Sequence, residues 1–184
     1  MTVFTHEIHE EATDEYGTPL DFHRPIADAV GGFDLDPAAG AERRPLADRR
    51  FTADDDGLTR AWDGKVWLNP PFSEKSLWVR RAREQVAAGN VQTAVVLLSV
   101  DTSTDLFHRH LAKADLICFR RGRLAFDGGG DSPNFGVLLA VFGEVNDDLL
   151  SVLQHMGTVF ENRDMLSRSE QSRLPIERGG GGSR

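Results

Sequence analysis

Residues 69–72 read Asn-Pro-Pro-Phe and directly follow the apolar run Val66–Leu68. Proline fixes φ near about −65° and disfavours helical geometry in the residue before it, so two prolines keep this segment extended and out of any helix. A buried strand that includes Val66–Leu68 must therefore stop there and present Asn69 at its carboxyl end. A purely structural interpretation is that the prolines form a turn that only terminates the strand.

The same tetrapeptide carries the groups needed to hold a planar amino group. The Asn69 side-chain oxygen and the Pro70 carbonyl oxygen are both hydrogen-bond acceptors, and one exocyclic NH2 has two hydrogens to donate. The Phe72 ring is available to stack on the ring that bears this amine. We therefore predict a catalytic site formed by Asn69, Pro70, Pro71 and Phe72.

Strand-like and helix-like patterns alternate along the rest of the chain. Strands are expected at 33–36, 66–68, 93–100, 115–119, 124–126 and 135–142. Helices are expected from Pro19 to Val30, from Ser73 to Ala88, from Thr104 to Leu111, and from Asp147 to about His155. This order predicts an α/β fold with an open, mostly parallel sheet, an antiparallel pair at one edge, and helices on both faces.

Three polar side chains fall at the ends of expected strands. They are Asp36, Asn69 and Asp101. Ligands of open α/β sheets bind outside the carboxyl ends of the strands, so we expect one cleft to collect all three. The small residues from Pro37 to Gly40 would let a ligand approach the backbone closely.

The 184 residues fit one domain, expected at 14–160, with a flexible lead-in at 1–13 and a polar, disordered tail at 161–184. The glycine-rich loop from Asp127 to Pro133 is expected to be mobile. The single cysteine, Cys118, excludes a disulfide framework, and His108 and His110 lie two positions apart, so they cannot share a helix face as metal ligands. Without a signal peptide or a long apolar run, we expect a cytoplasmic protein with no membrane partner. The modest size favours a monomer, and no cysteine–histidine cluster has the spacing of metal ligands, so no metal is expected.

The formal net charge of −8 disfavours a nucleic-acid partner unless basic residues are concentrated locally. Such concentrations occur at 80–83 and 120–123, where the basic residues are all arginine. An acidic chain with few lysines also suggests a protein adapted to high salt.

Six segments, taken in order, resemble the phage-type (Dam-like) DNA N6-adenine methyltransferases over about residues 14 to 142. The matching segments are 14–19, 34–39, 55–58 with Trp62, 69–72, 101–104, and 121–124 with Phe126. The resemblance implies a Rossmann-like fold, S-adenosylmethionine as the cofactor, and double-stranded DNA as the partner. It also implies a virus-encoded enzyme, for which a solitary protective role is more natural than a complete restriction system.

The resemblance assigns further residues to the cofactor and to the substrate. The implied cofactor-binding residues are Tyr16, Thr18, Pro19, Asp34, Asp36, Pro37, Ala38, Asp55 and Asp56. One of Asp34 and Asp36 would meet the amino or ribose groups of the cofactor, and one of Asp55 and Asp56 its adenine. The implied substrate pocket contains Asp101, Thr102 and Ser103. The Pro37–Gly40 segment departs from the glycine-rich cofactor loop that is common in methyltransferases.

Within this interpretation, Asn69 and Pro70 hold the N6 amine of an adenine that has been flipped out of the duplex and stacked on Phe72. DNA contact is assigned to Arg120, Arg121 and Arg123, with the loop to Asn134, although a charged strand edge that discourages aggregation would look similar. Arg80, Arg81 and Arg83 are better explained as an exposed helix face.

Two other functions stay open at this point. The Asn-Pro-Pro-aromatic motif also occurs in enzymes of this fold that methylate other planar amines or amides, such as RNA bases or protein glutamines. A non-catalytic nucleic-acid-binding module on a decayed methyltransferase scaffold would also fit the missing glycine-rich loop.

Overall fold

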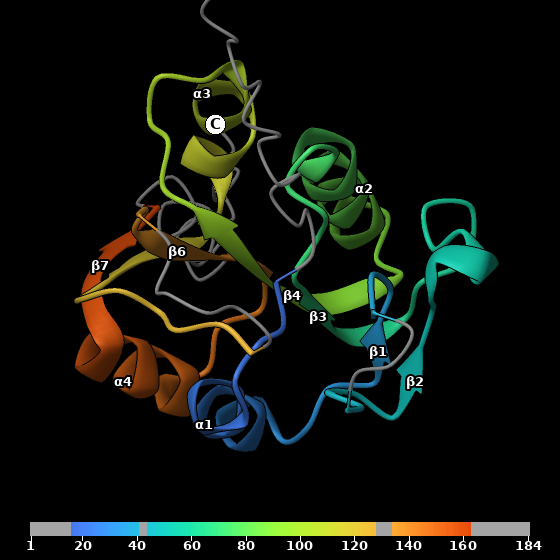
Figure 1. Cartoon of the computed structure of the whole chain (residues 1–184), viewed down its shortest axis with the longest axis horizontal. Coiled ribbons are helices and arrows are strands. Elements are labelled where there is room, and N and C mark those ends of the chain that lie inside the picture. Colours follow the sequence, from blue (N-terminus) through green and yellow to red (C-terminus); the bar gives the residue numbers. More distant parts are fainter. Residues whose placement is uncertain (1–15, 41–43, 128–133, 163–184) are drawn as a thin grey trace, which may run out of the picture.

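The computed structural model describes residues 16–40, 44–127 and 134–162, and these form one seven-stranded sheet flanked by helices (Figure 1). The strands are β1 (Leu35–Asp36), β2 (Arg49–Arg50), β3 (Gly64–Leu68), β4 (Val91–Ser99), β5 (Leu116–Arg120), β6 (Val137–Gly143) and β7 (Gly157–Glu161). Their order in the sheet is β2-β1-β3-β4-β6-β5-β7.

The strand directions place most carboxyl ends at one edge of the sheet. Strands β2, β1, β3 and β4 pair in parallel, β6 is antiparallel to both β4 and β5, and β7 is antiparallel to β5. Strand β5 therefore points in the same direction as β1 to β4. This sheet confirms the predicted α/β methyltransferase-like fold, with a mostly parallel core and an antiparallel edge.

Helices cover both faces of the sheet. Helices α1 (Leu20–Val30) and α4 (Asp147–Met156) lie on one face, and α2 (Lys75–Ala87) and α3 (Asp105–Arg109) lie on the other (Figure 1). Strand β4 serves both cores: Val95 and Leu97 pack toward α1 and α4, whereas Val96 and Leu98 pack toward α2. Burial on both faces explains why this strand reads as a continuous apolar run.

Local signals fix several helix ends. Gly31, in the left-handed conformation with φ of 76°, ends α1, and the N–H groups of Gly31 and Gly32 bond back to Asp28 and Ala27. The side chain of Thr104 caps α3, and that of Asn146 caps α4. The expected start of α2 at Ser73 is two residues early, because the helix begins at Lys75.

Three details differ from the sequence prediction. Residues 124–126 form no strand; instead Gly17 and Asp127 make a single antiparallel bridge. The helix expected to reach Leu111 ends at Arg109 and is followed by a 3-10 turn at Leu111–Lys113. Strands β2 and β7 were not predicted, since neither has an apolar alternation of its own and both depend on pairing with a neighbour.

The expected lead-in at 1–13, most of the loop at 127–133, and all but the first two residues of the tail at 161–184 lie outside the described residues. Within the described ranges, no helix is both long enough and apolar enough to span a membrane.

Candidate active site

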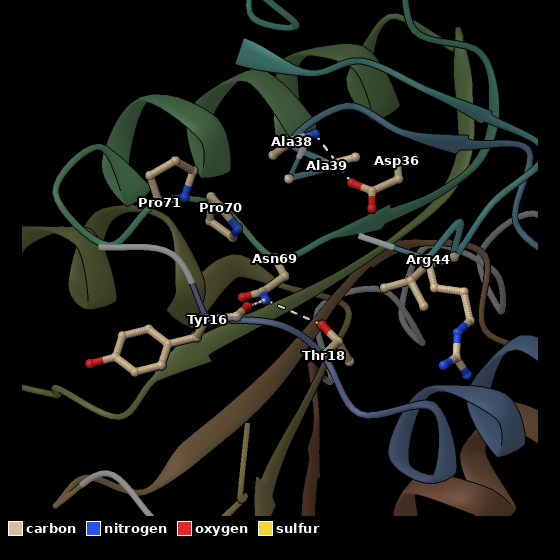
Figure 2. Close-up of a pocket in the computed structure, with 11 residues that line it drawn as sticks. Tyr16, Thr18, Asp36, Ala38, Ala39, Arg44, Asn69, Pro70 and Pro71 are labelled. Atoms are coloured by element: carbon tan, nitrogen blue, oxygen red, sulfur yellow. Dashed lines mark hydrogen bonds between the residues drawn. The ribbon is translucent and has the colours of Figure 1, made fainter. Parts of the chain in front are cut away.

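A pocket opens where the strand order reverses around β1. The chain passes from β1 to β2 on one side and then to β3 on the other, and such a switch point creates a crevice at the carboxyl ends of the strands. The pocket, whose volume is about 470 Å3 with its open mouth included, lies at this point (Figure 2). Its lining residues are Tyr16, Thr18, Asp36, Ala38, Ala39, Gly40, Arg44, Leu46, Asn69, Pro70 and Pro71.

The Asn69 side chain has one end bonded and the other end without a partner. Its nitrogen Nδ2 donates to the backbone oxygen of Tyr16 at 2.5 Å and to Oγ1 of Thr18 at 3.2 Å, as Figure 2 shows. A backbone carbonyl can only accept, so the amide nitrogen must face Tyr16 and the orientation of the amide is chemically determined. The oxygen Oδ1 is buried and has no hydrogen-bond partner among the described residues.

Two opposite charges line the same pocket. Asp36 is the last residue of β1, is only 6% exposed, and accepts a hydrogen bond from the backbone N–H of Ala38 at 3.2 Å. Arg44 is exposed and contributes the positive charge. Sequence reasoning missed Arg44, because it lies in a charged segment without periodicity.

A second pocket of about 560 Å3 adjoins the first and shares Ala38, Ala39 and Pro71 with it. Its further lining residues are Pro37, Thr52, Ala53, Asp56, Gly57, Leu58, Glu74 and Trp78. Gly57 brings two of its walls together, because a Cβ added there would lie 2.0 Å from the Pro37 oxygen. The buried Trp62 donates from Nε1 to the Gly57 oxygen at 2.7 Å and holds this close approach.

The structure separates the aspartates that the sequence left as pairs. Asp34 accepts the backbone N–H of Lys65 at 2.6 Å and lines neither pocket, whereas Asp36 lines the first. Asp55 accepts from the backbone N–H and Oγ1 of Thr52, and these bonds lower the pKa of its carboxyl. Asp56 lines the second pocket.

Phe72 belongs to a cluster of four aromatic rings beside the first pocket. Its ring stacks on Tyr16 with centroids 5.0 Å apart and an interplanar angle of 29°. Phe126 and Phe135 complete the cluster, with centroids 5.1 Å and 5.8 Å from that of Tyr16. Sequence reasoning gave Phe135 no site role, because it placed this residue inside the strand expected at 135–142, whereas β6 begins at Val137.

Residues Asp101 to Ser103 follow β4 but line neither pocket. Asp101 is exposed and accepts hydrogen bonds from the backbone N–H and the hydroxyl of Ser103, which lower the pKa of its carboxyl. The convergence of Asp36 and Asn69 in one pocket therefore does not extend to Asp101.

Arg120 ends β5, Arg121 and Arg123 follow it, and all three line a third, separate cleft together with Pro19. Asn134 is exposed. Among the described residues no group of histidine, cysteine and acidic side chains could hold a metal ion. His110 instead lies with Nδ1 2.9 Å from Nη1 of Arg83, and burial, followed by the charge of Arg83, lowers its pKa.

Comparison with known proteins gives a consistent family. Residues 5–165 match the model of the family described as DNA N-6-adenine-methyltransferase (Dam). The chain is 29% identical over 157 residues to a protein of Escherichia phage T1 named DNA N-6-adenine-methyltransferase, covering 73% of this chain and 64% of that protein. It is 34% identical over 96 residues to a protein of the same name from Haemophilus phage HP1, covering 51% of this chain and 54% of that protein. The matched regions thus span less than two thirds of either relative.

Proposed function

The chain belongs to the Dam family of DNA N-6-adenine-methyltransferases, and we propose that it transfers a methyl group from S-adenosylmethionine to N6 of an adenine flipped out of double-stranded DNA. Both phage relatives are named DNA N-6-adenine-methyltransferase, which supports adenine N6 in DNA as the methyl acceptor.

The observation that carries this proposal is the buried Oδ1 atom of Asn69 without a partner. A buried acceptor that lacks a hydrogen bond costs about 1–3 kcal/mol, and an amine hydrogen in that position removes the cost. Because Nδ2 is already bonded to Tyr16 and Thr18, the amide cannot rotate without losing both bonds. Solvent does not reach Oδ1 in this conformation, so neighbouring side chains move when the substrate base enters.

The two adjoining pockets fit the two ends of S-adenosylmethionine. The methionine end carries an ammonium and a carboxylate, which match Asp36 and Arg44 in the first pocket, with the Thr18 hydroxyl beside them. The second pocket offers apolar walls for a nucleoside, from Pro37, Leu58 and Trp78. The carboxylate of Asp56 in this second pocket can accept hydrogen bonds from the cofactor's amino or ribose groups.

The two pockets share Ala38, Ala39 and Pro71 as lining residues, so a cofactor that occupies both passes along this wall. When bound, the cofactor supplies a methyl group activated by a sulfonium. Alanine in place of glycine at 38 and 39 still leaves small side chains along this wall.

Asn69 and Pro70 act on the amine. The N6 lone pair of adenine is delocalised into its ring, which makes the amine a poor nucleophile. Acceptance of one N6 hydrogen by Asn69 Oδ1 and of the other by the Pro70 oxygen draws the nitrogen toward tetrahedral geometry and frees its lone pair. The rigid prolines keep both acceptors in place, so little reorganisation is needed. The nitrogen loses its proton after methyl transfer, and no strong general base is required.

Phe72 supplies a face for the flipped base. Extrusion of a base from the duplex costs a few kcal/mol, and stacking on an aromatic ring offsets part of that cost. Phe72 now stacks on Tyr16, so the base either takes the place of the Tyr16 ring or uses the opposite face of Phe72.

The direct test incubates the purified chain with S-adenosylmethionine and unmethylated double-stranded DNA, at low and at high KCl. The DNA is then digested to nucleosides, and N6-methyladenine is quantified by mass spectrometry. Asn69→Ala should remove the product. Asn90→Ala is the matched control, because Asn90 is exposed and bonds to Gln85 toward the end of α2 that is remote from the tetrapeptide.

Parallel reactions with RNA and with glutamine peptides distinguish the other substrates. Methylation of one of these, with none of DNA, would replace the substrate but keep the site. Failure to bind the cofactor by isothermal titration would instead favour the non-catalytic module. Stimulation of the reaction by high KCl would support the salt adaptation expected from the acidic composition.

A further inference from the structure

A basic cleft lies apart from the two cofactor pockets, where the start of α1, the turn after β5 and the end of α4 meet. Its volume is about 960 Å3, open space included. The lining residues are Pro19, Asp21, Phe22, Arg120, Arg121, Arg123, Leu124, Ala125, His155 and Met156. Three arginines here stand against one aspartate, in a chain whose formal net charge is −8.

The first of the three arginines is a structural brace of the turn. Nη1 of Arg120 donates to the backbone oxygens of Arg121 at 3.0 Å and Arg123 at 2.7 Å. The guanidinium also lies over the Phe22 ring, 5.7 Å from its centroid. These contacts fold residues 121–123 around Gly122, which has a φ of 75°. The Arg120 guanidinium therefore interacts with groups of the protein itself.

The other two arginines are exposed on either side of that glycine. The turn that carries them is anchored, because the backbone N–H of Arg121 donates to the Met156 oxygen at 3.0 Å, at the end of α4. A braced turn presents two guanidinium groups with little loss of backbone entropy when an anion binds. Guanidinium groups bind phosphate through two parallel N–H···O bonds, which makes phosphate the anion that best matches this pair. Asp21 also lines the cleft, but its carboxylate accepts the N–H of Phe22.

The cleft is connected to the candidate active site by one short segment. Strand β5 points in the same direction as β3, so Arg121 and Asn69 both follow strands at the same edge of the sheet. In this segment, the Tyr16 backbone oxygen accepts a hydrogen bond from the Asn69 amide nitrogen. Thr18 lines the first pocket, and the adjacent Pro19 lines the cleft. The Gly17 oxygen also accepts from the Asp127 N–H at 2.8 Å, which ties this segment to the chain beyond the arginines.

We propose, on the basis of the function proposed above, that Arg121 and Arg123 bind backbone phosphates of duplex DNA next to the flipped adenine, and that Arg120 only holds their turn. Phosphate contacts fix the position and register of a duplex and carry no sequence information. The cleft accordingly strengthens binding to every duplex by the same factor.

The test measures binding of a fluorescently labelled duplex by anisotropy over a series of KCl concentrations, with the full chain and without cofactor. Arg121→Ala and Arg123→Ala should each weaken binding on the order of tenfold at low salt. Each should also reduce the slope of log affinity against log salt by about one, with the same effect on duplexes of unrelated sequence. Arg80→Ala is the matched control, because this exposed arginine lies on α2, on the opposite face of the sheet from α1 and α4, and pairs with Glu84.

Thermal unfolding separates the brace from the phosphate ligands. Arg121→Ala should keep the melting temperature of the parent chain, whereas Arg120→Ala should lower it. Unchanged affinity and salt slope in Arg121→Ala and Arg123→Ala would overturn the proposal, as would an effect confined to RNA. If the variants lose DNA binding and the parent chain forms no N6-methyladenine, the proposed function is refuted but the cleft remains a DNA site. If the parent chain methylates DNA and the variants bind DNA as tightly as the parent does, the proposed function stands and the cleft proposal is refuted.

Discussion

The Asn69 side-chain nitrogen lies 2.5 Å from the backbone oxygen of Tyr16, a residue 53 positions earlier in the chain. This bond determines which atom of the amide is left to bind substrate. The Thr18 hydroxyl adds a second, longer bond at 3.2 Å to the same nitrogen. Tyr16 and Thr18 therefore both orient the Asn69 amide and line the pocket that we propose for the cofactor.

Asn69→Asp tests the orientation with a nearly isosteric change. A carboxylate places an oxygen against the Tyr16 carbonyl, and the two acceptors repel each other. We expect methyl transfer to fall by about 10²–10³-fold, the range found when one preorganised hydrogen-bonding group is removed from a site. Single-turnover rates at saturating DNA and cofactor measure this, with Asn90→Asp as the control. A rate within threefold of the parent (roughly 0.7 kcal/mol) would show that the amide orientation is unimportant.

Phe72→Ala tests the stacking face. Base–aromatic stacking contributes about 1–3 kcal/mol per base, so the KM for DNA should rise by roughly 5- to 150-fold. Binding of the cofactor should be unchanged, because Phe72 lines neither of the pockets proposed for it. Phe160→Ala is the control: this ring is 59% exposed on β7 and contacts Phe119 edge-on. Equal DNA affinities for the two variants would remove Phe72 from the base site.

Sequence patterns predicted most of the sheet and the position of the tetrapeptide at the end of a strand because both depend on local rules. Proline geometry ends β3 at Leu68, and two-sided burial makes β4 apolar throughout. Strand β7 follows no such rule. Most of its residues are exposed or half-buried, and it is held by pairing with β5.

The choice between Asp34 and Asp36 also required the structure. The two residues lie at alternate positions of one extended segment and look equivalent in sequence. They differ in the structure because the carboxylate of Asp34 accepts a hydrogen bond from the backbone N–H of Lys65, 31 residues away, whereas Asp36 lines the pocket. Arg44 likewise lines the pocket because of loop geometry, which no sequence pattern predicts.

This distinction predicts different outcomes for Asp36→Ala and Asp34→Ala. Loss of the Asp36 carboxylate should weaken binding of S-adenosylmethionine by about tenfold or more, since a hydrogen bond to a charged group is worth about 1.5–3 kcal/mol. Loss of Asp34 should instead lower the free energy of unfolding, because the Lys65 N–H loses its acceptor, and leave cofactor affinity within about threefold (roughly 0.7 kcal/mol). Isothermal titration and urea unfolding of both variants measure the two quantities. The reverse pattern would assign the cofactor contact to Asp34.

His23 gives the fold a pH dependence that is separate from the chemistry. This residue of α1 is 5% exposed, packs edge-on against Trp67 with centroids 4.7 Å apart, and has no hydrogen-bond partner at Nε2 among the described residues. Burial lowers its pKa from 6.5 to about 4, against a smaller opposing effect of the Asp28 charge. The imidazole is therefore neutral in the folded chain at neutral pH.

In the unfolded chain His23 has its ordinary pKa of 6.5 and is protonated below that pH, whereas in the folded chain it is not protonated until the pH approaches 4. The contribution of His23 to the free energy of unfolding is complete above pH 6.5 and declines as the pH falls toward 4, by roughly 3 kcal/mol at most. Urea unfolding across this range should show a shallower pH dependence in His23→Phe, which keeps a ring against Trp67, than in the parent chain. His108→Gln, at an exposed site, should keep the parent's dependence. Identical pH profiles for His23→Phe and the parent would mean that His23 titrates alike in the folded and unfolded chains.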